Sequence, residues 1–220
     1  MSSRIKIPLF IKKITKIDLG TLPGGTSSTA FDINSAGQIV GEGTSASGIT
    51  HGFLISGANR FDLSGNPNGP YSSARGINNL GHVVGVREVI NSAGKSVHHG
   101  FVRENDVMRD LGAYPPNDKD NSWSHADRIN DNGLIAGCIE VFGVVWDLSG
   151  APDFPPFPPF VLVTDKFGAR PSCTYDINNS GQSVGGGFRV RNSVSMPGRR
   201  IYNPRTIRLR LSRQLCARCE

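Results

Sequence analysis

The chain alternates short apolar segments with turn-forming residues. Apolar runs such as Ile7–Ile11 and Val144-Val145-Trp146 are separated by Gly, Asn, Asp and Pro. The spacing of about 3.6 residues that marks an amphipathic helix is absent. This pattern predicts short β-strands joined by tight turns.

A fourteen-residue pattern occurs four times without gaps. It reads S-x-[A/T]-x-x-I-N-x-x-G-x-x-[V/A]-G and starts at Ser28, Ser72, Ser124 and Ser172, so successive copies lie 44, 52 and 48 residues apart. In each copy the Asn can cap a turn with its side chain, and the first Gly can accept a positive φ. The pattern therefore predicts a β-hairpin with a loop of about three to five residues and a glycine bulge.

Two further strands are expected around each hairpin. An Asp-Leu step precedes it at positions 18–19, 62–63 and 110–111, and Lys13–Ile17 is the predicted strand before the first step. A His-Gly-Phe step follows it at positions 51–53 and 99–101. In the third copy, Val144-Val145-Trp146 is expected to take the place of that step. Each repeat thus offers four short strands.

Four strands in about 40–50 residues is the size of a propeller blade. One such sheet cannot bury both of its faces, so the copies must stack face to face. The predicted fold is all-β, a β-propeller or propeller fragment with about four four-stranded blades. A β-sandwich of about sixteen strands is the structural alternative, although it would not explain the ungapped repeat.

The repeats define the expected organisation of the chain. A basic N-terminal segment covers residues 1–12, and the repeats together cover 13–188. The single repeats fall at about 13–57, 58–106, 107–150 and 160–188. An Arg-rich tail covers residues 189–220.

Three segments of the first copy carry a resemblance to a known family: Asp18–Gly25 (DLGTLPGG), Ile33–Gly41 (INSAGQIVG) and His51–Leu54 (HGFL). On these segments the chain resembles the HAF family of bacterial repeat proteins, named for a His-Ala-Phe step. The similarity covers roughly residues 13–188, and both steps have Gly52 or Gly100 where the family name has Ala. The resemblance implies an extracellular location and supplies no catalytic residues.

The net charge of +6 is unevenly distributed. Residues 1–16 carry five basic residues and no acidic one, whereas residues 17–188 have a net charge of −7. Despite a pI near 9.4, this acidic body argues against nucleic acid as a partner. No apolar run approaches the ~20 residues of a membrane-spanning helix or the ~7–15 of a signal peptide. We therefore expect no membrane span, and this chain shows no signal peptide.

The composition changes abruptly after Gly187. Residues 189–220 contain nine arginines and no lysine, whereas the first 188 residues contain eight arginines and seven lysines. One hypothesis is that the tail is an out-of-frame product of GC-rich DNA that encodes a longer repeat protein. The other is a genuine basic tail that binds anionic surfaces or nucleic acid.

Three short motifs resemble catalytic or ligand-binding signatures, and the repeat explains each of them better. Gly181–Gly185 matches the G-x-S-x-G of serine hydrolases, but Ser183 stands where the other copies have Ile or Val. Ala93–Ser96 resembles the end of a phosphate-binding loop that lacks its first glycine. Asp32–Gly37 resembles a calcium loop, but Gly43 stands where its Glu is needed, and the second and third copies have Gly76 and Arg128 at the first ligand position. We predict no catalytic, cofactor-binding or metal-binding residues.

The histidines are predicted to be structural. His51 and His99 recur at one place in the repeat, where a ring of metal ligands is the alternative to hydrogen bonds that order a strand edge. His82, His98 and His125 show no ligand spacing.

The four cysteines predict no disulfide framework because they lie at irregular positions. Cys138 and Cys173 are expected to be small buried residues. Cys216 and Cys219 form a single CxxC, which has too few ligands for a closed zinc site.

These observations favour a non-enzymatic role. We expect an extracellular repeat or scaffold protein that binds an unknown protein or glycan partner without a cofactor. One alternative is a carbohydrate-active propeller enzyme, which would need paired Asp or Glu on one face. The recurrent Asp18, Asp62 and Asp110 are instead expected to be framework residues. The other alternative is binding of anionic surfaces or nucleic acid through the basic tail.

Overall fold

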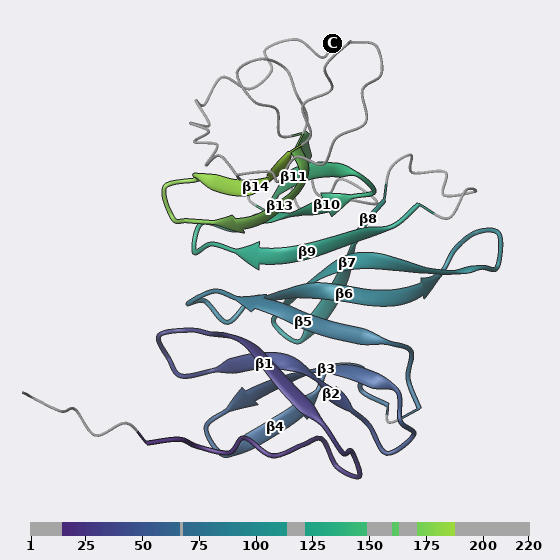
Figure 1. Cartoon of the computed structure of the whole chain (residues 1–220), viewed down its shortest axis with the longest axis vertical. Helices are drawn as coiled ribbons and strands as arrows, with labels where there is room; N and C mark the ends of the chain where they lie inside the picture. The colour runs from purple at the N-terminus through teal and green to yellow at the C-terminus, as the bar shows by residue number, and fades with distance from the viewer. Residues whose placement is uncertain (1–14, 67, 114–121, 149–159, 163–170, 188–220) are drawn as a thin grey trace, which may run out of the picture.

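The computed structural model of the chain describes residues 15–66, 68–113, 122–148, 160–162 and 171–187 (Figure 1). In this part of the chain every helix or strand assigned is a β-strand, and all strand pairs are antiparallel. The all-β prediction is therefore confirmed. No helix capable of crossing a membrane occurs in these residues. The basic segment 1–12, the Arg-rich tail 189–220 and its two cysteines lie outside them.

The strands form four sheets, each built around one hairpin of the repeat. The first sheet has the order β1 (Ser28–Ile33), β2 (Ile39–Thr44), β3 (Thr50–Ser56), β4 (Asn59–Asp62). The second has the order β5 (Ser72–Ile77), β6 (Val83–Ile90), β7 (Ser96–Glu104), β8 (Val107–Gly112). The third has the order β9 (Ser124–Ile129), β10 (Leu134–Ile139), β11 (Phe142–Asp147), β12 (Phe160–Leu162). The fourth contains β13 (Pro171–Ile177) and β14 (Ser183–Gly187).

The sheets stack on one another along the long axis of the molecule (Figure 1). β5 packs across β1, β2 and β3, β9 packs across β5, β6 and β7, and β13 packs across β9, β10 and β11. Three clusters of buried apolar residues fill the spaces between successive sheets. The cluster between the first and second sheets contains Val40 and Phe101, the next contains Val102 and Trp146, and the last contains Ala136 and Ile177. The hydrophobic core is thus a series of layers rather than one centre.

Each hairpin closes as the repeat predicts. Asn34 Oδ1 accepts hydrogen bonds from the backbone N–H groups of Ala36 (3.1 Å) and Gln38 (2.9 Å), and Gly37 has a φ of 76°. The turns at Asn78, Asn130 and Asn178 repeat these bonds. The side chain of Asn therefore supplies the turn with an acceptor, and the glycine supplies the positive φ.

The same asparagines link one sheet to the next. Asn34 Nδ2 donates to the carbonyl of Asn78 (3.0 Å), Asn78 Nδ2 to that of Asn130 (3.1 Å), and Asn130 Nδ2 to that of Asn178 (2.8 Å). Asn34, Asn78 and Asn130 are buried. We call these three bonds the asparagine ladder, which runs along one edge of the stack through all four sheets.

The residues that follow the ladder asparagines form a second line of contacts. Asn79 donates to both oxygens of Asp131, at 2.8 Å from its backbone nitrogen and 2.9 Å from Nδ2, and Asn179 Nδ2 donates to Asp131 Oδ2 (2.8 Å). Donors from Asn79 and Asn179 hold the pKa of the Asp131 carboxyl below its usual value. The turns therefore bind one another through both backbone and side chains.

The second glycine of the pattern is required by close packing. A Cβ on Gly85 would lie 1.9 Å from the carbonyl oxygen of Ser73 and 2.9 Å from the ring of Phe101. Gly41, Gly137 and Gly185 meet a carbonyl oxygen of the neighbouring strand in the same way. An irregularity in the pairing of the first strand recurs in all four hairpins, and its unpaired residue lies two positions after the one whose carbonyl the glycine meets. These positions leave no room for a side chain.

The Asp-Leu strands are grouped differently from the predicted repeats. β4 and β8 pair with β3 and β7, so each closes the sheet before it as a fourth strand instead of opening the next. The predicted strand at Lys13–Ile17 is wrong where it can be checked, because Thr15, Lys16 and Ile17 are not in a strand. In the described part of the chain, no His-Gly-Phe strand precedes residues 15–17, so these residues have no such strand to pair with.

The third copy departs from the predicted alignment by two residues. Val144 lies opposite Gly137, as Phe53 does opposite Gly41, so Phe142-Gly143-Val144 occupies the backbone position of the His-Gly-Phe step. Trp146 lies opposite Ile135, yet its ring reaches over Gly137 and fills the space that Phe53 and Phe101 fill elsewhere. The strand was predicted correctly, but its register was not.

Replacement of Gly85 by Ala tests the close approach. We expect a loss of about 3 kcal/mol or more in the free energy of unfolding, because the new methyl group overlaps the Ser73 carbonyl. Gly94→Ala is the control for a glycine that is required by its backbone alone: Gly94 has a positive φ (74°), unlike Gly85, and open space around it, so the change should cost only about 1–2 kcal/mol. Urea denaturation measures both values, and equal losses would contradict the packing argument.

Replacement of Asn78 by Asp tests the asparagine ladder. The substitution keeps an oxygen for the turn but exchanges the N–H donated to Asn130 for a second acceptor. We expect a loss of about 1–3 kcal/mol in unfolding free energy. Asn66→Asp is the matched control, because exposed Asn66 caps the N–H of Asn68 through its oxygen alone. If urea denaturation gave both variants the wild-type stability, the ladder would have no energetic role.

Candidate ligand-binding site between the second and third sheets

The recurrent histidines are hydrogen-bonded inside their own sheets. His51 is fully buried, with Nδ1 2.8 Å from Asp62 Oδ2 and Nε2 3.1 Å from the carbonyl of Gly69. His99 Nδ1 lies 3.0 Å from Asp110 Oδ2. These contacts agree with the predicted structural role, in which the imidazole ties the third strand to the fourth.

The recurrent aspartates are framework residues, as predicted. Asp62 and Asp110 accept the histidine contacts, and each also accepts a backbone N–H two residues further along the chain, as does Asp18. Each carboxylate therefore fixes the backbone of the two residues that follow it, beyond the end of β4 at Asp62 and within β8 at Asp110.

The three signature-like motifs also lie in structural elements. Ser183 is buried in β14, and Ala93–Ser96 belongs to the turn and the strand start between β6 and β7. Asp32 accepts the N–H of Ile33 (2.9 Å) and that of Ile77 in the next sheet (3.0 Å). Both oxygens of this carboxylate are thus engaged by backbone.

A pocket of about 230 Å³ opens at the joint between the second and third sheets. Its lining comes from the first strands of both sheets, the residues just before those strands, and β6 and β7. The lining residues are Tyr71, Arg75, Val86, His98, Trp123, Ser124 and His125.

Two stacked ring pairs form much of this lining. The rings of Tyr71 and His98 lie 5.0 Å apart between centroids, and those of Trp123 and His125 lie 5.6 Å apart at an interplanar angle of 10°. Trp123 is 39% exposed, an unusual position for so large an apolar side chain. Two aromatic rings and two imidazole rings therefore line the pocket together.

An ion pair crosses the joint beside the rings. Arg75 Nη1 lies 2.7 Å from Asp127 Oδ1, and His125 Nδ1 lies 2.9 Å from Asp127 Oδ2. Burial raises the pKa of the Asp127 carboxyl, but the adjacent His125 and Arg75 outweigh burial and hold this pKa below its usual value. Arg75 and Asp127 are the unpaired residues of the irregularities in β5 and β9. The irregularity that recurs in each repeat thus places opposite charges side by side.

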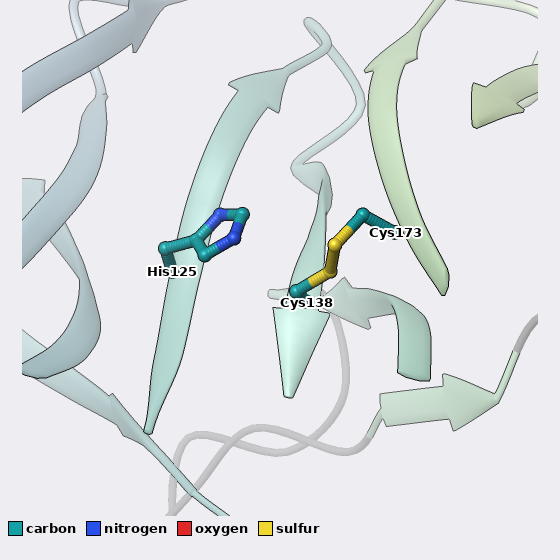
Figure 2. Close-up of side chains that lie close together, drawn as sticks. All are labelled: His125, Cys138 and Cys173. Atoms are coloured by element: carbon teal, nitrogen blue, oxygen red, sulfur yellow. A yellow bond between two sulfur atoms is a disulfide. The ribbon is translucent and has the colours of Figure 1, made fainter. Parts of the chain in front are cut away.

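Cys138 is buried as predicted, but the prediction that the cysteines form no disulfide was wrong. Cys138 in β10 and Cys173 in β13 form a disulfide with Cα atoms 5.0 Å apart. They are 35 residues apart in sequence, and only the stacking of the fourth sheet on the third brings them together. This bond joins two sheets covalently, beside His125 (Figure 2).

Sequence reasoning did not find the pocket residues, although the repeat held a signal. Tyr71 and Trp123 directly precede the Ser that opens the second and third copies, so aromatic residues recur at one position. The first and fourth copies have Ser27 and Pro171 at this position, so it is not part of the four-copy pattern. His125, which showed no ligand spacing, lies among the pocket residues because two sheets meet there.

Comparisons with protein-family models, curated proteins and solved structures found no match to this chain. The geometry of the site therefore carries the functional argument.

Replacement of Asp127 by Asn tests the charge cluster through pH. A carboxyl whose pKa is lower in the folded chain than the ~3.9 of the unfolded chain adds stability above that value. This stability is lost as the pH falls through the folded pKa. We therefore expect the wild type to lose unfolding free energy more steeply than Asp127→Asn below about pH 4.

Urea denaturation at several pH values between about 3 and 7 measures this difference. Asp106→Asn is the control, because Asp106 is 88% exposed in its ion pair with Arg103 and contributes little. Parallel curves for wild type and Asp127→Asn would contradict the assignment.

Proposed function

We propose that the chain is an arc of a β-propeller whose blades are the stacked sheets. Four successive sheets with one repeated hairpin and one continuous ladder support this interpretation. The Ile of the repeat is buried at Ile77, Ile129 and Ile177 (5–7% exposed), whereas Ile33 in the first sheet is 61% exposed. The first sheet thus exposes Ile33 at a position that is buried in the other three sheets. In a complete propeller, another blade would cover this residue.

We further propose that this arc is a non-enzymatic binding module and that its pocket takes a neutral, hydroxyl-rich ligand, a glycan. The observation that carries this proposal is the pair of aromatic rings, Tyr71 and Trp123, that line the pocket together with two imidazoles and a serine. An aromatic face packs against the C–H face of a sugar ring, and imidazole nitrogens exchange hydrogen bonds with hydroxyl groups. Asp127 neutralises Arg75, which favours an uncharged ligand.

The disulfide supports an extracellular location, which the HAF resemblance also implies. Disulfides persist in oxidising compartments and are rare where thiols are kept reduced. A propeller that displays a binding pocket outside the cell would gain from the covalent joint between its third and fourth sheets.

A carbohydrate-active enzyme is the competing function for the same pocket. Glycoside hydrolysis ordinarily uses two carboxyl groups that flank the scissile bond. Among the described residues that line the pocket there is no Asp or Glu, and Asp127 behind them is held by Arg75 and His125. This arrangement favours binding over turnover.

Replacement of Trp123 by Ala tests the binding site. We first screen the full chain against a panel of oligosaccharides and then measure affinity for each hit by calorimetry. Loss of the exposed indole should weaken binding at least about tenfold, since buried aromatic contacts dominate binding energy. Phe61→Ala is the matched control, because Phe61 is similarly exposed (44%) but lies in the first sheet, and it should bind as the wild type does.

Two results would redirect the interpretation. Equal affinity of Trp123→Ala and wild type for every hit would remove the pocket as the site. Release of new reducing ends from a bound oligosaccharide by the wild-type chain would favour the enzyme.

A further inference from the structure

Beside the pocket, the imidazole of His125 faces a pair of sulfur atoms that glycan binding does not use. The sulfurs of Cys138 and Cys173 and a ring nitrogen of His125 all lie within 4.8 Å of one another. The three residues come from β10, β13 and β9, and Figure 2 shows the imidazole turned toward the disulfide. Two sulfurs and one imidazole are a ligand set that zinc prefers.

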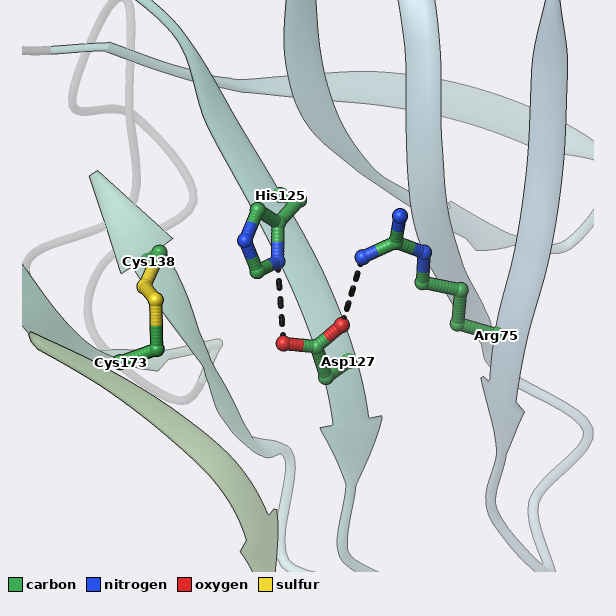
Figure 3. Close-up of a disulfide and its surroundings, with 5 residues drawn as sticks. All are labelled: Arg75, His125, Asp127, Cys138 and Cys173. Atoms are coloured by element: carbon green, nitrogen blue, oxygen red, sulfur yellow. Dashed lines mark hydrogen bonds and ion pairs between the residues drawn. A yellow bond between two sulfur atoms is a disulfide. The ribbon is translucent and has the colours of Figure 1, made fainter. Parts of the chain in front are cut away.

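The imidazole is held in the orientation that a metal ligand requires. Its Nδ1 faces Asp127 Oδ2 at 2.9 Å, and its other nitrogen, Nε2, points toward the two sulfurs (Figure 3). Trp123 stacks on the ring, and Arg75 of the second sheet holds the other oxygen of Asp127 at 2.7 Å. A carboxylate behind a histidine fixes its tautomer and raises its basicity, and this arrangement is typical of zinc sites.

We propose that reduction of the Cys138–Cys173 disulfide creates a zinc site. The two thiolates and His125 Nε2 bind one Zn²⁺, and water takes the fourth position. With Zn–S bonds of about 2.3 Å, a tetrahedral site needs sulfurs about 3.8 Å apart. Once the S–S bond is broken, rotation of the two side chains about their Cα–Cβ bonds provides this separation with the Cα atoms near their present 5.0 Å.

The change of state balances with a dithiol as reductant. The dithiol gives two electrons and two protons to the disulfide and becomes a disulfide itself, while the Cys138–Cys173 bond breaks to give two thiols. Zn²⁺ then displaces the two thiol protons, because cysteine binds zinc as thiolate. In the reverse direction, a second disulfide compound acts as the oxidant and accepts two electrons from the two thiolates. This restores the Cys138–Cys173 bond and expels the ion. The joint between the third and fourth sheets is thus held by an S–S bond or by an S–Zn–S bridge, according to the redox state.

The test uses the full chain with Cys216→Ser and Cys219→Ser, which leaves Cys138 and Cys173 as the only cysteines. This protein is reduced with a phosphine, which does not chelate zinc as a dithiol does, and is mixed with Zn²⁺ and passed through a desalting column. Atomic emission should find about one zinc per chain after reduction and none in the oxidised protein. Co²⁺ in place of Zn²⁺ should give the visible spectrum of a tetrahedral thiolate site.

Variants in this background assign the ligands. His125→Gln should lose stoichiometric zinc, and Asp127→Asn should bind it about 10–100-fold more weakly. His98→Gln is the matched control, because His98 lines the same pocket but is not a member of the Cys–His group, and it should bind zinc as the background does. Cadmium NMR of the background protein checks the ligand set without relying on the folding of any variant, since its shift distinguishes S₂N from S₂O coordination.

Two outcomes would overturn the zinc site. One is a reduced background protein that retains no metal. The other is a cadmium shift without nitrogen coordination, together with unchanged zinc binding by His125→Gln. Because the glycan screen is made on the oxidised chain, either outcome is independent of the proposed binding function.

Discussion

The asparagine of each of the first three repeats performs two tasks with one amide group, and the arrangement of the sheets depends on both. Its oxygen accepts two backbone N–H groups and closes the hairpin, while its nitrogen donates to the carbonyl of the matching asparagine in the next sheet. An aspartate at this position would lack the N–H that donates to the next sheet, and a serine would have only one polar group for the two tasks. Because buried polar groups need partners, the stacking of the next sheet satisfies the amide nitrogen that each of these three turns leaves buried. The ladder therefore fixes the register between sheets as well as the shape of each turn.

Close packing follows from this fixed register. The second glycine of each repeat lies under a carbonyl oxygen of the neighbouring strand, and an aromatic ring covers it in the first three sheets. In the third sheet Trp146 reaches this space from a different backbone position than Phe53 or Phe101. The stack thus requires that the space be filled, and it tolerates a change in the residue that fills it.

The candidate chemistry lies at positions where the repeats differ. Tyr71 and Trp123 precede the repeated Ser, Arg75 and Asp127 are the unpaired residues of equivalent strand irregularities, and the two cysteines come from different places in their repeats. The repeated residues hold the sheets in place, so the intervening residues are free to vary. The joint between the second and third sheets has in this way acquired rings and a neutralised ion pair, and the next joint has acquired a disulfide.

The sequence by itself determined the elements that rest on local interactions. The hairpins, their asparagine-capped turns and their positive-φ glycines follow from residues within about five positions of one another, and the face-to-face stacking follows from sheets too small to bury themselves. Tertiary structure alone decided that β4 and β8 close the preceding sheet, that Trp146 replaces a phenylalanine, and that Cys138 meets Cys173. It also placed His125 between Asp127 and the disulfide. The disulfide joins residues 35 positions apart, so it depends on which faces meet when the sheets stack. β4 and β8 follow β3 and β7 through tight turns, and Trp146 lies on the strand paired with that of Gly137, but the sequence pattern left open which sheet each strand joins and which side chain covers the glycine.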